Sequence, residues 1–185
     1  MKTNLSAIAL GLVLAYAAAP VMADDATVTQ MGNDDFVVVN QNSSVSATVT
    51  VEQKTGNNNR IEHLYQTGGA NSGNLTQDGY RNAATIDQVS HWNQSNTATL
   101  AQKGNDNVAA LSQSSNDYSW VNLTQTGNSN EATLDQKSDG YSWATLTQTE
   151  GNGNKLWLYQ SVAGNDAGNI KQTGYGNIAS VNQHR

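Results

Sequence analysis

The chain has 185 residues, no cysteine and a formal net charge of −6 at pH 7, and only 13% of its residues are charged. The acidic balance argues against nucleic-acid binding, which needs clustered Lys and Arg, and the lack of cysteine excludes disulfides, zinc fingers, iron–sulfur clusters and thiol catalysis. Asparagine and glutamine are abundant and hydrophobic residues make up 37%, so a thick core is not expected. Disorder would leave no regular apolar positions, and this chain has them.

Residues 1–23 have the features of a secretory signal peptide. Lys2 precedes an apolar run over residues 5–19, and the segment ends in the small residue Ala23. A transmembrane anchor is the alternative, but the run is shorter than the ~20 residues that a span needs, and Asp24 and Asp25 follow at once. We expect cleavage after Ala23, so that residues 24–185 are exported without a transmembrane segment.

Residues 24–185 form an internal repeat that the glutamines mark. One series of glutamines recurs at a nearly constant spacing. About half of that spacing after each of these residues comes a glutamine of a second series. The first series is Gln30, Gln53, Gln77, Gln102, Gln125, Gln148 and Gln172. The second series is Gln41, Gln66, Gln88, Gln113, Gln136, Gln160 and Gln183. Only Gln94 falls outside both series, so we expect seven repeats in a single domain.

Four repeats, at residues 77–88, 102–113, 125–136 and 172–183, share one pattern. Counted from the first Gln, each repeat has Gly two residues later, Asn five later, Ala seven later, an aliphatic residue nine later and the second Gln eleven later. A further aliphatic residue precedes each first Gln by two positions. Offsets of two are typical of strands. We therefore expect two strands per repeat, joined by a tight Gly-x-x-Asn turn in which Gly and Asn tolerate positive φ.

One strand–turn–strand unit cannot bury its inward side chains, whereas stacked units can, so the expected fold class is all-β: a β-solenoid of seven stacked repeats. Buried amides are costly unless paired, and in a stack each Gln or Asn can bond to the identical residue of the next rung. The ladder positions are both glutamine series together with Asn82, Asn107, Asn130, Asn154 and Asn177. The inward apolar positions are Val28, Val51, Leu75, Ile86, Leu100, Leu111, Leu123, Leu134, Leu146, Ile170 and Val181.

Three repeats depart from the pattern. Residues 148–160 have one extra residue in the turn, and residues 53–66 have two extra residues. In the latter repeat the pattern leaves open whether Leu64 or Tyr65 points inward. The first repeat has Asp35 and Val37 where the regular repeats have Asn and Ala.

The string Gln-x-Gly-x-x-Asn-x-Ala-x-x-x-Gln is similar to the curlin repeat of curli subunits, which build the functional amyloid fibres of bacterial biofilms. The resemblance covers residues 24–185 and recurs in full in four repeats. It implies a β-solenoid subunit that is exported through an outer-membrane channel and polymerises with itself at the cell surface as cross-β fibres. The family's ladder positions fall, in the last repeat, on Gln172, Asn177 and Gln183.

The resemblance also implies partners, namely the other curli subunit and the export machinery. Only Asp24–Thr27 precede Val28, where the well-known curlins carry a targeting segment rich in Gly and Asn, and seven repeats are more than those curlins have. The family has a major subunit that builds the fibre and a minor subunit that nucleates it, and the minor form tends to have a degenerate, basic last repeat. The regular last repeat of this chain favours the major subunit, with the minor subunit as the alternative.

Other functions fit the pattern less well. His63, His91 and His184 lie in different repeats, so we expect neither an enzyme nor a cofactor. Asp34 and Asp35 suggest a calcium site, but the other repeats lack a matching acidic pattern, so no metal is expected.

An ice-binding solenoid would present uniform Thr-x-Thr rows. Residues 124–126 and 147–149 match such a row, but Glu52 and Lys54 interrupt it. This function is therefore a weaker alternative.

The aromatic residues are predicted to lie outside the interior. Trp92, Trp120 and Trp143 precede the expected strand starts, in or beside the loops between repeats. Trp157 and Tyr159 alternate with aliphatic residues and so face outward, where they cover the sheet or bind sugars of a biofilm matrix.

The ends of the repeat array predict polymerisation. Val28 is expected to begin a strand near the start of the exported chain, and the strand that holds Gln183 runs nearly to its end. Open strand edges without caps favour head-to-tail stacking of subunits. Residues 168–185 contain no acidic residue, so they lack the like-charge repulsion that keeps segments from aggregating, and we expect this repeat to be the most fibre-prone.

Overall fold

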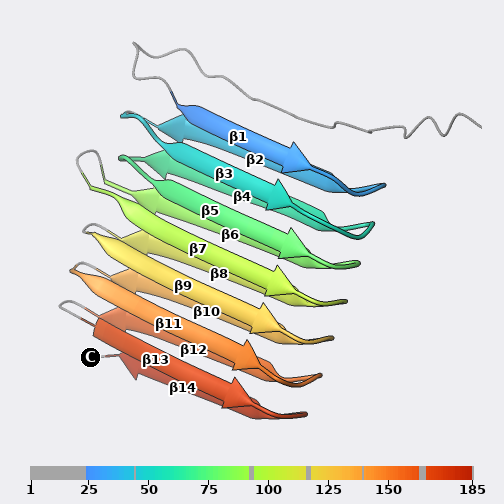
Figure 1. The fold of residues 1–185 in the computed structure, drawn as a ribbon. Coiled ribbons are helices and arrows are strands. Elements are labelled where there is room, and N and C mark those ends of the chain that lie inside the picture. Colours follow the sequence, from blue (N-terminus) through green and yellow to red (C-terminus); the bar gives the residue numbers. More distant parts are fainter. Residues whose placement is uncertain are drawn as a thin grey trace, which may run out of the picture.

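The computed structural model describes residues 24–43, 45–91, 94–115, 118–138, 140–162 and 166–184. In this part of the chain all regular structure is β, in fourteen strands that form two seven-stranded parallel sheets (Figure 1). The odd-numbered sheet contains β1 (Asp25–Gln30), β3 (Thr48–Gln53), β5 (Ser72–Asp78), β7 (Asn96–Lys103), β9 (Ser119–Thr126), β11 (Ser142–Thr149) and β13 (Asp166–Thr173). The even-numbered sheet contains β2 (Phe36–Ser43), β4 (Arg60–Gly68), β6 (Ala83–Ser90), β8 (Val108–Ser115), β10 (Glu131–Ser138), β12 (Lys155–Val162) and β14 (Ile178–His184).

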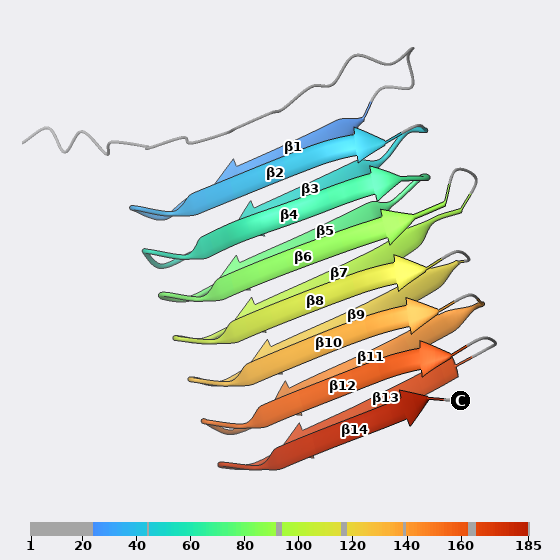
Figure 2. The same ribbon diagram turned by 180° about the vertical axis from the view of Figure 1, so that it is seen from behind.

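The predicted β-solenoid is confirmed. Each repeat places its first strand in the odd-numbered sheet and its second strand in the even-numbered sheet, and successive repeats pair in parallel (Figure 2). The register aligns the repeats Gln to Gln, as where Gln102 pairs with Gln125 and Gln113 pairs with Gln136. Because each turn of the chain lies directly on the previous one, every inward position of the sequence becomes a column through the stack.

The turn glycines are required by the close approach of neighbouring rungs. Gly127 has a φ of 118°, and a Cβ placed on it would lie 2.0 Å from the carbonyl oxygen of Gly151. No side chain fits at that distance, and positive φ is costly for residues with a Cβ. The column of glycines therefore follows from the stacking distance as much as from the turn itself.

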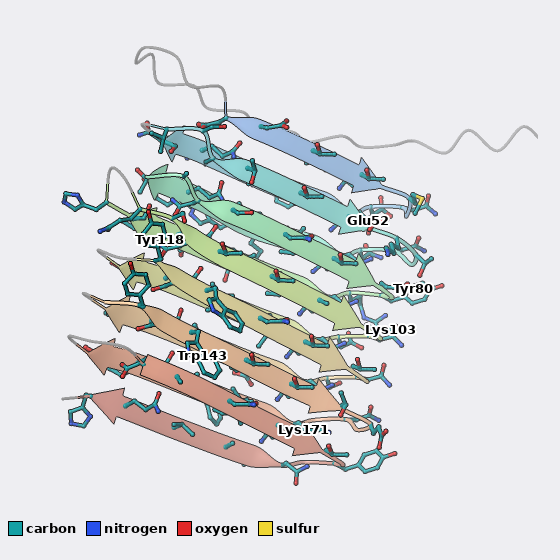
Figure 3. All side chains as sticks on the ribbon, turned by 60° about the vertical axis from the view of Figure 1, so that its left-hand side comes forward. Glu52, Tyr80, Lys103, Tyr118, Trp143 and Lys171 are labelled. Atoms are coloured by element: carbon teal, nitrogen blue, oxygen red, sulfur yellow. The ribbon has the colours of Figure 1, made fainter. Side chains whose placement is uncertain are left out.

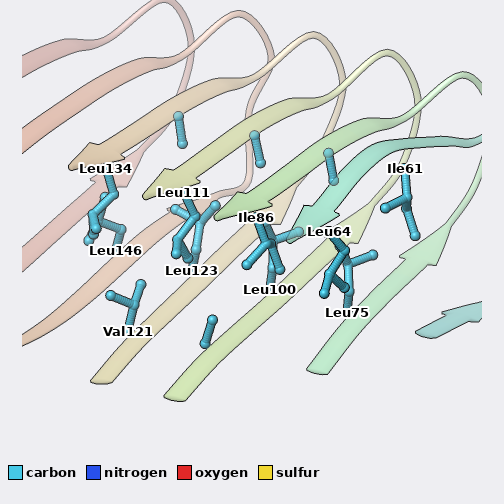
Figure 4. Packing of buried hydrophobic residues seen from close by; sticks show 14 of the residues in the cluster. Ile61, Leu64, Leu75, Ile86, Leu100, Leu111, Val121, Leu123, Leu134 and Leu146 are labelled. Carbon is cyan, nitrogen blue, oxygen red and sulfur yellow. The ribbon is translucent and has the colours of Figure 1, made fainter. Parts of the chain in front are cut away.

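The core is a single layer of apolar side chains between the two sheets. Every inward apolar position of the five inner rungs is at most 2% exposed, whereas Val28, Ile170 and Val181 of the two end rungs are only partly buried. Residues of the even-numbered sheet point toward residues of the odd-numbered sheet (Figure 4). The labelled pairs are Leu64 with Leu75, Ile86 with Leu100, Leu111 with Leu123, and Leu134 with Leu146.

The longest repeat keeps its pattern through a bulge in β4. The strand register shifts between Ile61 and His63, so one extra residue is taken up there and the other lies in the preceding turn. Leu64 points inward and is fully buried, while Tyr65 faces outward beside Asp87. Packing thus decides the choice that the sequence left open.

Two expectations need comment. Trp120 and Trp143 were expected to precede the strands, in or beside the loops, but they are the second residues of β9 and β11. Trp92, of the same prediction, lies outside the described residues. Their side chains lie on the outer face, and the strands begin earlier than predicted because Ser119 and Ser142 are buried and paired in the sheet. The expected signal peptide, residues 1–23, lies outside the described residues. Among the described residues, no helix is long and apolar enough to span a membrane.

Candidate functional site

The first glutamine series forms a continuous hydrogen-bonded column along the odd-numbered sheet. The Nε2 of each residue donates to the Oε1 of its counterpart in the next rung, from Gln30 to Gln172, over 2.8 to 3.0 Å. In most rungs Nε2 also donates across the interior, as Gln125 does to the carbonyl oxygen of Val108 at 3.0 Å. From Gln53 to Gln172 these amides are therefore buried and satisfied, and they tie the two sheets together.

The second glutamine series forms a matching column along the even-numbered sheet. The donation again runs toward the C-terminal rung, from Gln41 to Gln183, over 2.7 to 3.2 Å. A bond across the interior is repeated here too, as where Gln113 Nε2 donates to the carbonyl oxygen of Thr97 at 3.3 Å. The two columns lie at opposite edges of the apolar layer, and each closes one edge.

The asparagines form a third column in the turns, and its bonds run in the opposite direction. Asn107 donates from both its backbone N–H and its Nδ2 to Asn82 Oδ1, each over 3.1 Å. Its Nδ2 also donates forward to the carbonyl oxygen of Gly127 at 2.8 Å. Asn130, Asn154 and Asn177 likewise each donate back from the backbone N–H and Nδ2 to the asparagine of the preceding rung.

Sequence reasoning missed two sets of buried polar residues. Asn59 is fully buried and belongs to the asparagine column, but the extra residue in its turn hid the spacing. The second set lies six residues before the first Gln of a repeat, which is an inward position at period two. In this set Asn96 donates its backbone N–H to Asn71 Oδ1 at 3.0 Å, and Ser119 and Ser142 are buried in the same column.

The columns end at two open rungs. Among the described residues, β1 and β2 have neighbouring strands on one side only, as do β13 and β14. Gln30 and Gln183 are half-buried and Asn177 is exposed, although the equivalent residues of the inner rungs are buried. Gln41 and Gln172 of the same rungs are buried. The end rungs thus have an unpaired strand edge, and only part of their ladder amides is exposed.

The charged residues lie almost entirely on the outer faces and in the turns (Figure 3). Arg81 bridges two rungs by donating to both carboxylate oxygens of Asp106, at 2.7 and 2.8 Å. These bonds hold the pKa of Asp106 below its usual value. Lys155 pairs with Glu131 of the preceding rung at 2.9 Å. Exposed pairs of this kind contribute little to stability, so the buried ladders carry more of it.

Aromatic residues stack between rungs on the outer face of the odd-numbered sheet. The rings of Trp120 and Trp143 are 5.6 Å apart and nearly parallel, and those of Tyr118 and Tyr141 are 5.8 Å apart. Figure 3 shows Tyr118 and Trp143 on this face. Each pair covers part of the sheet surface, in keeping with an outward position.

No constellation for catalysis or metal binding is evident in the described part of the chain. His63 pairs with Asp87 at 3.0 Å on the outer face, while His91 and His184 belong to other rungs. Among the described residues, no group of three or more His, Asp or Glu side chains is placed to hold a metal ion. The ladders and the open end rungs are therefore the candidate functional features.

Comparison with known proteins found no matching family model, no similar curated protein and no similar solved structure.

Proposed function

We propose that this chain is an exported structural subunit that polymerises head to tail by stacking the last rung of one copy on the first rung of the next. The observation that carries the proposal is the match between the two open rungs. Gln30 and Gln41 are eleven residues apart, as are Gln172 and Gln183, and each pair is joined by a turn of equal length. One copy can therefore continue both sheets of another without a shift in register.

The hydrogen-bond directions of the two ends are complementary. Inside the solenoid each Gln donates toward the C-terminal rung, so the first rung offers the Oε1 atoms of Gln30 and Gln41 as acceptors and needs donors before it. The last rung supplies these donors as the Nε2 groups of Gln172 and Gln183. Two first rungs or two last rungs facing each other would not match in this way. The ladders therefore favour one polarity along the whole polymer.

The apolar residues of the two end rungs also match. In the same register Ile178, which is 71% exposed, lies against Phe36, which is 38% exposed. Ile170 lies against Val28, and both are only partly buried in the single subunit. Val181, also partly buried, lies against Val39, which is already fully buried. Stacking removes this apolar surface from water, which favours association by about 25 cal/mol per Å².

The curlin-like repeat pattern supports a more specific proposal. The subunit builds curli-type amyloid fibres at the bacterial cell surface, where they serve in the biofilm matrix and in adhesion. The regular last rung favours the major, fibre-building subunit, because it presents a complete set of ladder residues to the next copy. In this proposal the partners are other copies of the chain, the nucleating subunit and the export machinery.

A pair of glycine variants tests the head-to-tail geometry in residues 24–185. In the inner rungs, a Cβ on the turn glycine would collide with the carbonyl oxygen of the glycine in the next rung. Within one subunit a Cβ on Gly174 meets only Asn177 Nδ2, at 3.6 Å. In the polymer it would collide with the carbonyl oxygen of Gly32 of the next copy. Gly176 lies in the same turn with a φ of 63°, and a Cβ there has nothing within 4 Å. Gly174→Ala is therefore expected to abolish fibre growth, whereas Gly176→Ala is expected to polymerise like the natural chain.

Growth is followed by thioflavin fluorescence and sedimentation, with circular dichroism to show that both variants retain β structure. Fibres of the natural chain are expected to diffract at ~4.7 and ~10 Å, the strand and sheet spacings. Equal growth of the two variants would contradict stacking through the end rungs. A natural chain that stays monomeric for days would contradict the proposed function altogether.

A further inference from the structure

Asp35 occupies the asparagine position of the first rung, and its carboxylate is incompletely paired there. Its side chain is 7% exposed, and Oδ1 accepts the backbone N–H of Asn59 at 2.8 Å. Oδ2 is buried and has no hydrogen-bond partner. In the neighbouring rung, Lys54 pairs with Glu52 and Arg60 pairs with Glu62, and among the described residues no cation pairs with Asp35.

An asparagine at this place donates in two directions. In most inner rungs Nδ2 donates forward to a glycine carbonyl, as Asn59 does to Gly79 at 2.8 Å. Nδ2 also donates back to the asparagine Oδ1 of the preceding rung, as Asn82 does to Asn59 at 3.2 Å. Asp35 has an oxygen in place of this nitrogen, and a Cβ on Gly32 would lie close to both this Oδ2 and the carbonyl oxygen of Gly56, at 2.3 and 2.1 Å. Both acceptor oxygens therefore lie beside Gly32, and Oδ2 has no donor there.

The presence of Asp in place of Asn at position 35 has a further consequence when a second copy stacks on the first rung. The residue that then precedes Asp35 in the column is Asn177 of the second copy, which presents its Oδ1. The backbone N–H of Asp35 can donate to that oxygen, in the same way that Asn59 N–H donates to Asp35. The second bond of the column is lost, because a carboxylate oxygen faces the Asn177 amide oxygen.

We propose that Asp35 makes the junction between two copies weaker than the junctions between rungs within a copy, and so limits self-assembly of this chain. The inference rests on the proposed function, because it concerns the same stacking of a last rung on a first rung. At every inner junction that joins two asparagines, Nδ2 donates back to the Oδ1 of the preceding rung. Each junction between copies lacks this donor and places a carboxylate oxygen of Asp35 against the Oδ1 of Asn177. The unmade bond and the repulsion between the two oxygens arise only on stacking, so this cost is imposed once per added subunit.

The test compares Asp35→Asn with Asp34→Asn in residues 24–185. Asp34 is the exposed neighbour in the same turn with a φ of 57°, which asparagine tolerates, so both variants remove one negative charge from the same place. Only the change at position 35 restores the column. The measurement is the concentration of soluble chain that remains in equilibrium with fibres, in enough urea to keep it measurable.

Asp35→Asn is expected to lower this soluble concentration about tenfold, which corresponds to one satisfied buried hydrogen bond. Asp34→Asn is expected to leave it within about twofold of the natural value. In Asp35→Asn, the new bond from the Nδ2 of position 35 to the carbonyl oxygen of Gly56 is expected in monomer and fibre alike, so it cancels in this equilibrium. Equal effects of the two variants, or no effect of either, would overturn the role of Asp35 while fibre formation itself stands. Absence of fibres from the natural chain would instead defeat the proposed function.

Discussion

A glutamine inside this protein is stable only because an identical glutamine lies in the next rung. Gln125 is fully buried, accepts from Gln102 Nε2 and donates both to Gln148 Oε1 and to a backbone carbonyl, with each bond at 3.0 Å. Burying an amide without such partners costs several kcal/mol, and the stack supplies them from its own repetition. The residue therefore acts as a connector between rungs and between sheets.

Replacing this residue should destabilise the whole chain. Gln125→Ala leaves Gln102 without an acceptor and Gln148 without a donor, so we expect the free energy of unfolding to fall by about 3 kcal/mol or more. Urea unfolding followed by circular dichroism measures the change. The matched control is Gln183→Ala in the half-buried end rung, which interrupts the column on one side only and should cost about 1 kcal/mol. Similar losses at the two sites would show that the ladder bonds contribute little.

At the scale of elements, the strand–turn–strand unit tolerates extra residues only where they leave the inward positions unchanged. In β4 the extra residue forms a bulge between Ile61 and Leu64, and both of these remain fully buried. Bulges place one additional residue against a single partner and restore the alternation beyond it. Elsewhere a change of one residue would turn the following side chains to the opposite face.

Two single-residue deletions should therefore have opposite outcomes. Deleting His63 shortens the distance from Asn59 to Gln66 to the six residues found in every other repeat, so stability should change by less than about 1 kcal/mol. Deleting Thr133 moves Leu134 and Gln136 to the outer face and should cost at least about 3 kcal/mol. Thermal and urea unfolding of the two variants measure this difference. A large loss on deletion of His63 would show that the bulge itself stabilises the fold.

At the scale of the molecule, the protein is a one-dimensional stack in which each rung contacts only its neighbours. In such an array stability is a sum of rung and interface contributions, so the rungs with a single neighbour are the least stable. The end rungs here are also the rungs with partly buried apolar residues. Polymerisation supplies the missing neighbour at each end.

Hydrogen exchange should report this difference directly. In the monomer, amides of β1, β2, β13 and β14 should exchange faster than those of β7 to β10, because the end rungs open without disturbing the centre. In the fibre the end strands should become as protected as the central strands. The central strands serve as the internal reference. End strands that stay rapidly exchanging in the fibre would indicate lateral association in place of end-to-end stacking.

Much of the architecture was predictable from the sequence because stacking imposes the same requirement on every rung. The period-two alternation, the Gly-x-x-Asn turns and the spacing of the glutamines together predict strands, turns and columns without knowledge of the three-dimensional structure. A local signal that recurs seven times is reliable where each repeat has the common length. The buried positions of Leu123, Gln125, Asn130 and Leu134 follow from it directly.

Other features depended on contacts between rungs that no single repeat contains. The inward choice of Leu64 was decided by packing in the column between Val39 and Ile86, and Asn59 joined the asparagine column despite its irregular spacing. The opposite directions of the glutamine and asparagine ladders arise from the placement of each amide against the neighbouring backbone. The unpaired oxygen of Asp35 arises in the same way. The sequence alone predicts which residues of a regular repeat point inward, because the alternation of a strand is local. The donor and acceptor of each ladder bond are known only from the folded stack, because hydrogen bonds between rungs depend on distance and orientation across it.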